Sequence, residues 1–218
     1  MSFIDRSKLA ESLRKALESS PKRNFKQSVE LIVVLRDVDV KSPEGRIREI
    51  VFMPYPINKE VKICIVADGD MALKAKEAGA YKVITREELT RIQGNRKEAK
   101  RIAQQCDWVL VRADLMPLVG RILGPALGPR GKIPIPVPMN ADITVMLKKY
   151  QSATMIRTKD QPQIMCRIGT EDIPIEQLVE NALTVLSSLE SKLKNPTYNI
   201  AKIIVKTSMG PPVEVPLR

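Results

Sequence analysis

The sequence predicts an α/β protein of two domains, in which a Rossmann-like α/β domain is inserted into a discontinuous α+β domain formed by both termini. Three observations predict this organisation. The 218 residues are enough for two ordinary domains. Short strands and helices alternate only in the middle of the chain, which indicates a parallel sheet. The outer segments combine β-branched strands with single amphipathic helices. We place the terminal domain at residues 1–56 and 153–218 and the inserted domain at residues 57–152.

The N-terminal segment predicts one helix followed by two strands. Leucine and alanine recur at helical spacing over Asp5–Ser19, and Pro21 prevents the helix from continuing. The β-branched run Ser28–Leu35 predicts a strand, and a second strand is expected over Arg46–Met53. Their spacing favours an antiparallel pair of these two strands.

The rest of the chain divides into an alternating part and a second antiparallel part. The expected strands of the alternating part are 61–67, 81–85 and 107–112, and its expected helices are 70–78, 86–93 and 96–105. Beyond residue 150, strands are expected over 153–157, 161–168 and 200–207. Between the last two, an amphipathic helix is expected, with Pro174 in its first turn and Asn195-Pro196 at its end. Two connections, near Pro54–Pro56 and near Gln151–Ala153, would then join the domains as a double hinge.

The charge of the chain favours a polyanionic partner but does not locate its site. Lysine and arginine exceed acidic residues by 36 to 25, a net charge of +11. Residues 57–152 hold 17 basic and 10 acidic residues, or +7, whereas the outer segments hold 19 and 15, or +4. Net charge alone would therefore place the polyanion-binding site in the middle of the chain. The absence of histidine removes the commonest general base and metal ligand, so a non-enzymatic protein without a cofactor is expected.

Composition also predicts a cytoplasmic protein without a disulfide framework. Hydrophobic residues make up 44% of the chain, yet no run of about eighteen apolar residues occurs and the N-terminus lacks a signal-peptide pattern, so no membrane partner is expected. The cysteines Cys64, Cys106 and Cys166 lie far apart. Their odd, unpatterned number argues against both a disulfide framework and a cysteine metal site.

The segment Gly120–Pro138 is rich in glycine and proline and carries a Gly-Lys pair, which invites comparison with a phosphate-binding loop. The comparison fails because Ala126 stands where the leading glycine is needed and Ile133 where a magnesium-binding hydroxyl is needed. Only one glycine follows the strand before Asp68, where a dinucleotide fingerprint needs three. Acidic residues stand at the expected strand ends, and the simplest interpretation is that they begin helices or face water; they are Asp68, Asp70, Asp107 and Asp114.

Side-chain alternation places polar residues together on one face of three expected strands. Met165 and Arg167 share a face, as do Ser28 and Glu30, and the row of Lys202 continues towards Ser208. If the strands are neighbours, this face suits RNA, where cations meet phosphates and hydroxyls meet ribose. The ordinary alternatives are that the lysines mark the wet side of a sheet and that Phe25 is a core residue rather than a stacking platform.

Three segments carry a resemblance to a known family. The stretch Gly120–Pro138, with its Leu-Gly-Pro and Gly-Pro-Arg-Gly pieces, closely resembles the signature of the L-one family of ribosomal proteins. Phe25–Glu30 resembles the aromatic-led strand entry of that family, and Lys206–Pro211 resembles its threonine-methionine-glycine motif. The chain looks archaeal: it has Met53–Pro56 where bacterial members show leucine-proline-histidine-glycine, and Ser208 in place of a threonine.

The resemblance implies a protein that binds large-subunit ribosomal RNA and forms the mobile stalk near the exit path of deacylated transfer RNA, whose release it assists. It also implies repression of translation through a similar structure in the protein's own messenger RNA, and a monomer when free. The contacts that it implies are Phe25, Ser28, Glu30, Met165, Thr207, Ser208, Met209 and Gly210, with Lys22, Arg23, Arg157, Lys159, Arg167 and Lys202 as neighbours. Thr207, Ser208 and the following turn would present hydroxyls and backbone to ribose.

Two other functions stay open on the sequence. A nucleotide- or phosphate-binding enzyme would act through Gly124–Lys132 together with Asp68, and would bind a mononucleotide saturably. A DNA-binding architectural protein would prefer duplex DNA to structured RNA, although no helix-turn-helix or zinc-ligand spacing supports it.

Overall fold

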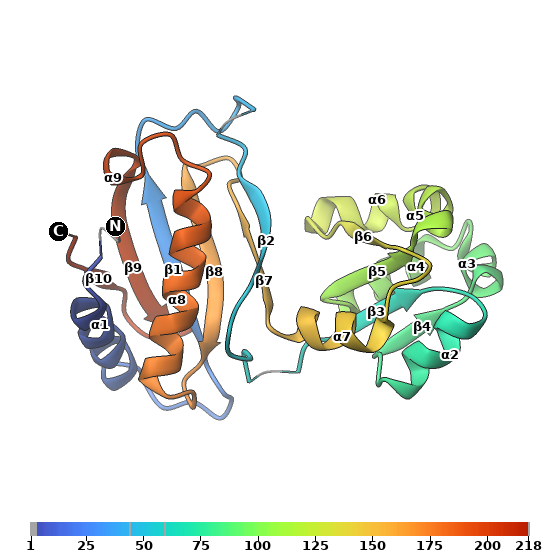
Figure 1. Cartoon of the computed structure of the whole chain (residues 1–218), viewed down its shortest axis with the longest axis horizontal. Coiled ribbons are helices and arrows are strands. Elements are labelled where there is room, and N and C mark those ends of the chain that lie inside the picture. Colours follow the sequence, from blue (N-terminus) through green and yellow to red (C-terminus); the bar gives the residue numbers. More distant parts are fainter. Residues whose placement is uncertain (1–3, 44, 59, 218) are drawn as a thin grey trace. The chain divides into compact units, whose positions relative to one another are not determined.

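The computed structural model describes residues 4–43, 45–58 and 60–217 (Figure 1). The chain divides into two compact units: Met1–Lys59 with Ser152–Arg218, called here the terminal unit, and Glu60–Gln151, called the inserted unit. No helix among the described residues is long and apolar enough to cross a membrane.

The terminal unit is built on an antiparallel sheet of four strands in the order β10-β9-β1-β8. Its elements are α1 (Arg6–Glu18), β1 (Ser28–Leu35), β2 (Arg48–Phe52), β7 (Ala153–Arg157), β8 (Gln163–Thr170), α8 (Ile175–Glu190), α9 (Pro196–Asn199), β9 (Ile200–Thr207) and β10 (Val213–Val215). The expected pairing of the first two strands is wrong, because β1 pairs with β8 and β9 while β2 pairs with β7 as a separate ribbon. The long link between β1 and β2 does not hold them in register, so their closeness in sequence does not decide the pairing.

Alternation along the strands gives the four-stranded sheet one buried face and one open face. The buried face packs apolar residues of β1, such as Leu31 and Val33, against Leu9 and Leu13 of α1 and Leu178 of α8. Figure 1 shows α8 running along the sheet. The helices therefore complete a single core, while the opposite face of the sheet is partly exposed and carries both polar and apolar side chains, such as Glu30 and Ile32.

The buried Asn181 of α8 fixes the segment that follows β2. Its side-chain oxygen accepts a hydrogen bond from the Tyr55 amide at 3.1 Å, and its amide group donates to the carbonyls of Tyr55 and Ile168 at 3.2 and 2.8 Å. Because Asn181 is fully buried, these bonds satisfy a polar side chain that would otherwise destabilise the core.

The inserted unit contains a parallel sheet in the order β4-β3-β5-β6. Its elements are β3 (Ile63–Val66), α2 (Asp70–Glu77), β4 (Lys82–Ile84), α3 (Arg86–Ile92), α4 (Arg96–Gln105), β5 (Trp108–Arg112), the 3-10 turn Ala113–Leu115, α5 (Met116–Ile122), α6 (Gly124–Leu127), the 3-10 turn Gly128–Arg130, β6 (Pro134–Val137) and α7 (Ile143–Gln151). Side-chain caps fix the starts of two of these helices: Thr85 and Glu88 form a capping box at α3, and Asn95 accepts from the Glu98 amide at α4.

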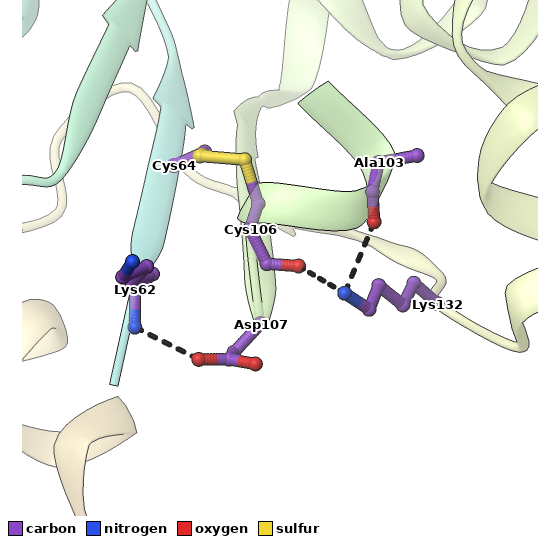
Figure 2. The surroundings of a disulfide bond; sticks show 6 residues. All are labelled: Lys62, Cys64, Ala103, Cys106, Asp107 and Lys132. Atoms are coloured by element: carbon purple, nitrogen blue, oxygen red, sulfur yellow. Dashed lines mark hydrogen bonds between the residues drawn. A yellow bond between two sulfur atoms is a disulfide. The ribbon is translucent and has the colours of Figure 1, made fainter. Parts of the chain in front are cut away.

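A disulfide joins Cys64 of β3 to Cys106, which precedes β5, with their Cα atoms 5.6 Å apart (Figure 2). The expectation that the cysteines form no disulfide is therefore wrong for this pair. The reason lies in the sheet, where parallel register sets Cys64 opposite Val109 and so brings Cys106 close to β3. Cys166 remains a free thiol in the core, and burial raises its pKa to about 12, with a smaller contribution from Glu30.

Candidate nucleic-acid interface

The open face of the terminal sheet carries an ordered array of outward-pointing side chains. Glu30 of β1 lies opposite Arg167 of β8 and Lys206 of β9. Two residues further along, Ile32 lies opposite Met165 and Ile204, and the next row pairs Val34 with Gln163 and Lys202. The sheet therefore brings the expected face residues of three strands together, with cations on both sides of the Glu30 carboxylate.

The turn after β9 is tied to the first residue of β1. The Ser208 amide donates to the Ser28 carbonyl at 3.0 Å, and the Ser28 amide donates to the Ser208 hydroxyl at 3.2 Å. The Lys206 ammonium donates to the Ser208 carbonyl at 3.2 Å. These bonds extend the pairing of β1 and β9 beyond the strand and fix Ser28 and Ser208 next to each other at one end of the open face.

The fully buried Gln27 joins this turn to the loop after α1. Its side-chain oxygen accepts from the Met209 amide at 3.0 Å, while its amide group donates to the Ser20 hydroxyl at 2.9 Å and the Pro21 carbonyl at 2.8 Å. Sequence reasoning missed Gln27, because a glutamine before a strand has no pattern that marks it as a buried connector. Its three bonds join the loop that holds Lys22, Arg23 and Phe25 to the turn that holds Ser208, Met209 and Gly210.

Thr207 and Gly210, which flank Ser208 and Met209 in the sequence, are buried rather than exposed to solvent. Thr207 is fully buried, and its hydroxyl is 2.7 Å from the hydroxyl of Ser20. A β-carbon added to Gly210 would lie 2.3 Å from the Thr207 hydroxyl oxygen. The sequence suggested that both residues present groups to ribose; in the structure their close packing instead sets the shape of the turn that presents Met209.

Three large apolar side chains of the expected site stand out into solvent. Phe25 and Met209 are each 53% exposed and Met165 is 52% exposed. The interpretation of Phe25 as a core residue is therefore wrong. Phe25 lies in the loop held by Gln27 and Met209 in the turn held by the same side chain, so both have fixed backbones and accessible side chains. Such groups can stack on or pack against bases.

The loop that contains Phe25 is also basic. Lys22 and Arg23 are exposed, and neither takes part in an ion pair with the residues that the structure describes. Lys26 pairs with Asp172 at 2.8 Å, and this bond, with a second from Thr170, holds the pKa of the Asp172 carboxyl below its usual value. Lys22 and Arg23 are therefore available to bind a polyanion, whereas Lys26 anchors the loop through its ion pair with Asp172.

The remaining expected residues lie towards the other end of the sheet. Arg157, Lys159 and Met165 line a depression of about 320 Å³ together with Asp160, Gln161 and Gln163. Arg157 faces Arg48 across the β2–β7 ribbon, and burial, with the charge of Arg157, lowers the pKa of Arg48. Lys202 pairs with Glu214 at 3.3 Å. This end is basic, but it lacks the anchored turn.

The groups of the alternative nucleotide site lie at opposite ends of β5. The Lys132 ammonium donates to the carbonyls of Ala103 and Cys106, which precede that strand (Figure 2). Asp68 accepts from the Arg86 amide at 2.8 Å and lies 3.8 Å from Arg112, the last residue of β5. Asp68 and Lys132 therefore cannot act on one phosphate. Among the described residues, no group of three or more potential ligands is placed to hold a metal ion.

Comparisons with known proteins agree with the resemblance. The model of the Ribosomal protein L1p/L10e family matches residues 15–211. A protein named large ribosomal subunit protein uL1 from Hyperthermus butylicus is 64% identical over 218 residues, covering 100% of both chains. A protein of the same name from Staphylothermus marinus is 61% identical, over 99% of both chains. Another from Aeropyrum pernix is 53% identical, over 95% of this chain and 94% of the relative. The chain belongs to the Ribosomal protein L1p/L10e family.

Proposed function

We propose that this chain is a structural constituent of the large ribosomal subunit that binds ribosomal RNA through the terminal unit. Family membership assigns it to the large subunit, a particle of the cytoplasm. The observation that carries the choice of surface is the exposure of Phe25 and Met209 on two loops held together by the buried Gln27. A binding surface fixed before RNA arrives loses less conformational entropy when the complex forms.

The proposed contacts form two groups with different chemistry. Phe25, Met209 and Met165 supply surfaces for bases, and Ser208 supplies a hydroxyl group next to Met209. The Ser28 side chain is buried, so Ser28 contributes through the bond from its amide to Ser208. Lys22, Arg23, Arg157, Lys159, Arg167 and Lys202 face phosphates, which makes their contribution dependent on salt. Glu30 orients Arg167 and Lys206 or accepts from ribose hydroxyls. Thr207 and Gly210 act through the shape of the turn.

The proposal extends to three finer roles of the same surface. The bound RNA is the stalk region near the tRNA exit site, where the protein assists release of deacylated tRNA. A similar structure in the protein's own messenger RNA would occupy the same surface and repress translation. Because one surface serves both RNAs, the messenger fragment should compete with the ribosomal fragment for the free, monomeric protein.

The test is binding of the full-length protein to a stalk fragment of large-subunit ribosomal RNA and to an unrelated RNA duplex of equal length, over a salt series. We expect the stalk fragment to bind more tightly, with a preference that persists as salt rises, because contacts to bases and hydroxyls do not release counterions. Equal affinities that fall together with salt would leave only a basic protein. A preference for duplex DNA would instead favour the architectural alternative.

A further inference from the structure

The inserted unit contains a cavity of about 400 Å³ on its helical surface, distant in the sequence from the terminal interface. It is formed by the loop between α3 and α4, the first half of α4, the end of α5 and the start of α6. Its lining residues are Ile92, Gln93, Gly94, Asn95, Arg96, Ala99, Lys100, Arg121, Ile122, Pro125 and Ala126.

The floor of the cavity is apolar. Ile92, Ala99 and Ala126 are buried in the core of the inserted unit and present part of their surface to the cavity, and Ile122 and Pro125 complete this side. An apolar surface bounded by polar groups is suited to a flat hydrophobic ring. Water is poorly held by such a surface, so a ring that covers it gains the free energy of apolar burial.

The rim of the cavity is positive and carries no acidic residue. Arg96, Lys100 and Arg121 are all exposed, and none of them forms an ion pair with any residue that the structure describes. Lys97 and Arg101 continue the positive charge along the same helix. Three cations around an apolar floor define a ligand that is anionic at its edge and hydrophobic at its centre.

The loop between α3 and α4 adds a side chain that can form hydrogen bonds with a ligand. Gln93 directly follows α3 and is exposed, and its side-chain amide forms no hydrogen bond with any residue that the structure describes. Gly94 has a φ of +85°, a left-handed conformation that turns the chain sharply into α4. The side-chain oxygen of Asn95 already accepts a hydrogen bond from the Glu98 amide, which caps the helix. Gln93 is thus the amide available to bond the edge of a ring in the cavity.

We propose that this cavity binds an unpaired nucleotide of a single-stranded RNA segment. The base lies on the apolar floor, the Gln93 amide bonds its edge, and the phosphates on either side meet Arg96, Lys100 and Arg121. A peptide made of acidic residues alone would match the rim and leave the floor uncovered, so RNA fits the whole cavity better. This second RNA contact adds to the proposed function and uses none of the terminal interface residues.

The test uses the full-length protein and a fluorescent six-nucleotide oligouridylate, which has little structure of its own. The double variant Lys100→Gln/Arg121→Gln removes two rim cations. The matched control Lys76→Gln/Lys148→Gln removes two exposed cations from α2 and α7 of the same unit. We expect the rim variant, and not the control, to reduce the slope of log affinity against log salt by about 1.4, or about 0.7 for each lost phosphate contact.

Two competitors and one direct binding measurement identify the ligand. Hexaglutamate should displace the oligouridylate only weakly, because it does not cover the floor; displacement as effective as that by unlabelled oligouridylate would overturn the assignment to RNA. Uridine monophosphate should compete only at much higher concentration, since it offers a single phosphate; equal potency would overturn the assignment to a strand. An RNA duplex should bind equally to the rim variant and its control. Equal slopes for both double variants with oligouridylate would remove the cavity from RNA binding.

Discussion

The inserted unit has more positive charge than the terminal unit, yet the candidate interface of the terminal unit has the more firmly fixed loops. By the sequence boundaries, residues 57–152 carry a net charge of +7 and the outer segments +4. Both units pair some of their cations internally, as in Lys26–Asp172 and Arg112–Asp114, but the terminal unit also uses the buried Gln27 to fix two loops. Net charge therefore measures attraction to a polyanion, whereas fixed geometry is what can discriminate one RNA from another.

The two units also differ in what holds them together. The terminal unit depends on antiparallel pairing and on side-chain hydrogen bonds between its ends, while the inserted unit has a disulfide across its parallel sheet. This difference gives ways to perturb one unit and leave the other intact.

The largest expected effect is on the stability of the inserted unit after the disulfide is removed. The bond closes a chain separation of 42 residues, which corresponds to about 4 kcal/mol in the chain-entropy description. Cys64→Ala/Cys106→Ala should therefore speed hydrogen exchange in β3 and β5 and leave β1 and β9 unchanged. Stalk RNA affinity should not change, because no proposed terminal contact lies in that unit. Equal acceleration in both units would show that they are not independently stabilised.

Thiol titration provides a direct check on the disulfide itself. The native protein should show no reactive thiol at mildly alkaline pH, because Cys166 is buried and its pKa is raised to about 12. After unfolding without reductant, only Cys166 should react. Three reactive thiols in that sample would contradict the Cys64–Cys106 bond.

A smaller effect is expected on RNA binding when Met209 is shortened. Met209→Ala should weaken stalk RNA binding by about 1–3 kcal/mol, the range of residues at the centre of an interface. The matched control is Met139→Ala, which shortens a similarly exposed methionine of the inserted unit, 60% exposed against 53%. Isothermal titration with the same RNA gives both values. Equal losses for the two variants would place Met209 outside the site.

A still smaller change is expected from one phosphate contact. Lys22→Gln should lower the slope of log affinity for the stalk RNA against log salt by about one unit. Lys148→Gln, which removes a cation from α7, should leave that slope unchanged. An unchanged slope for Lys22→Gln would mean that its charge is only a solvated surface feature.

The smallest effect concerns acid stability of the loop that carries Phe25. Bonds from Lys26 and Thr170 lower the pKa of Asp172 from 3.8 in the folded state. Its contribution to stability is therefore present above 3.8 and is lost as the pH falls through the lower folded-state pKa. Asp172→Asn should be less stable than the native chain near neutral pH, and the difference should shrink in acid. A difference that is independent of pH would exclude the ionised pair as its cause.

Sequence patterns predicted the local elements better than the contacts between them. The strands over 28–35 and 200–207 and the helix over 96–105 have the expected bounds, because each has clear periodicity or a cap. β6 was not predicted because Pro134 and Pro136 remove amide donors, but β6 is an edge strand that needs to bond only β5. The β2–β7 pairing and the disulfide depend on residues distant in the sequence, which no local pattern encodes.

The candidate site shows the same limit. Alternation predicted which side chains of β1, β8 and β9 share a face, since pleating fixes that order. It could not decide whether Phe25 is buried, because a single aromatic residue in a loop has no periodicity. Nor could it find Gln27, or show that Thr207 and Gly210 pack against each other under the turn. These features arise only when the two ends of the chain meet.

Cross-link mapping tests the central claim most directly. The full-length protein would be irradiated in complex with the stalk RNA fragment, and the RNA-bound peptides would be identified by mass spectrometry. We predict cross-links at Phe25 and Met209, the exposed side chains on the two loops joined by Gln27. Cross-links confined to residues 60–151, with none in 20–30 or 206–210, would contradict the assignment of the interface to the terminal unit.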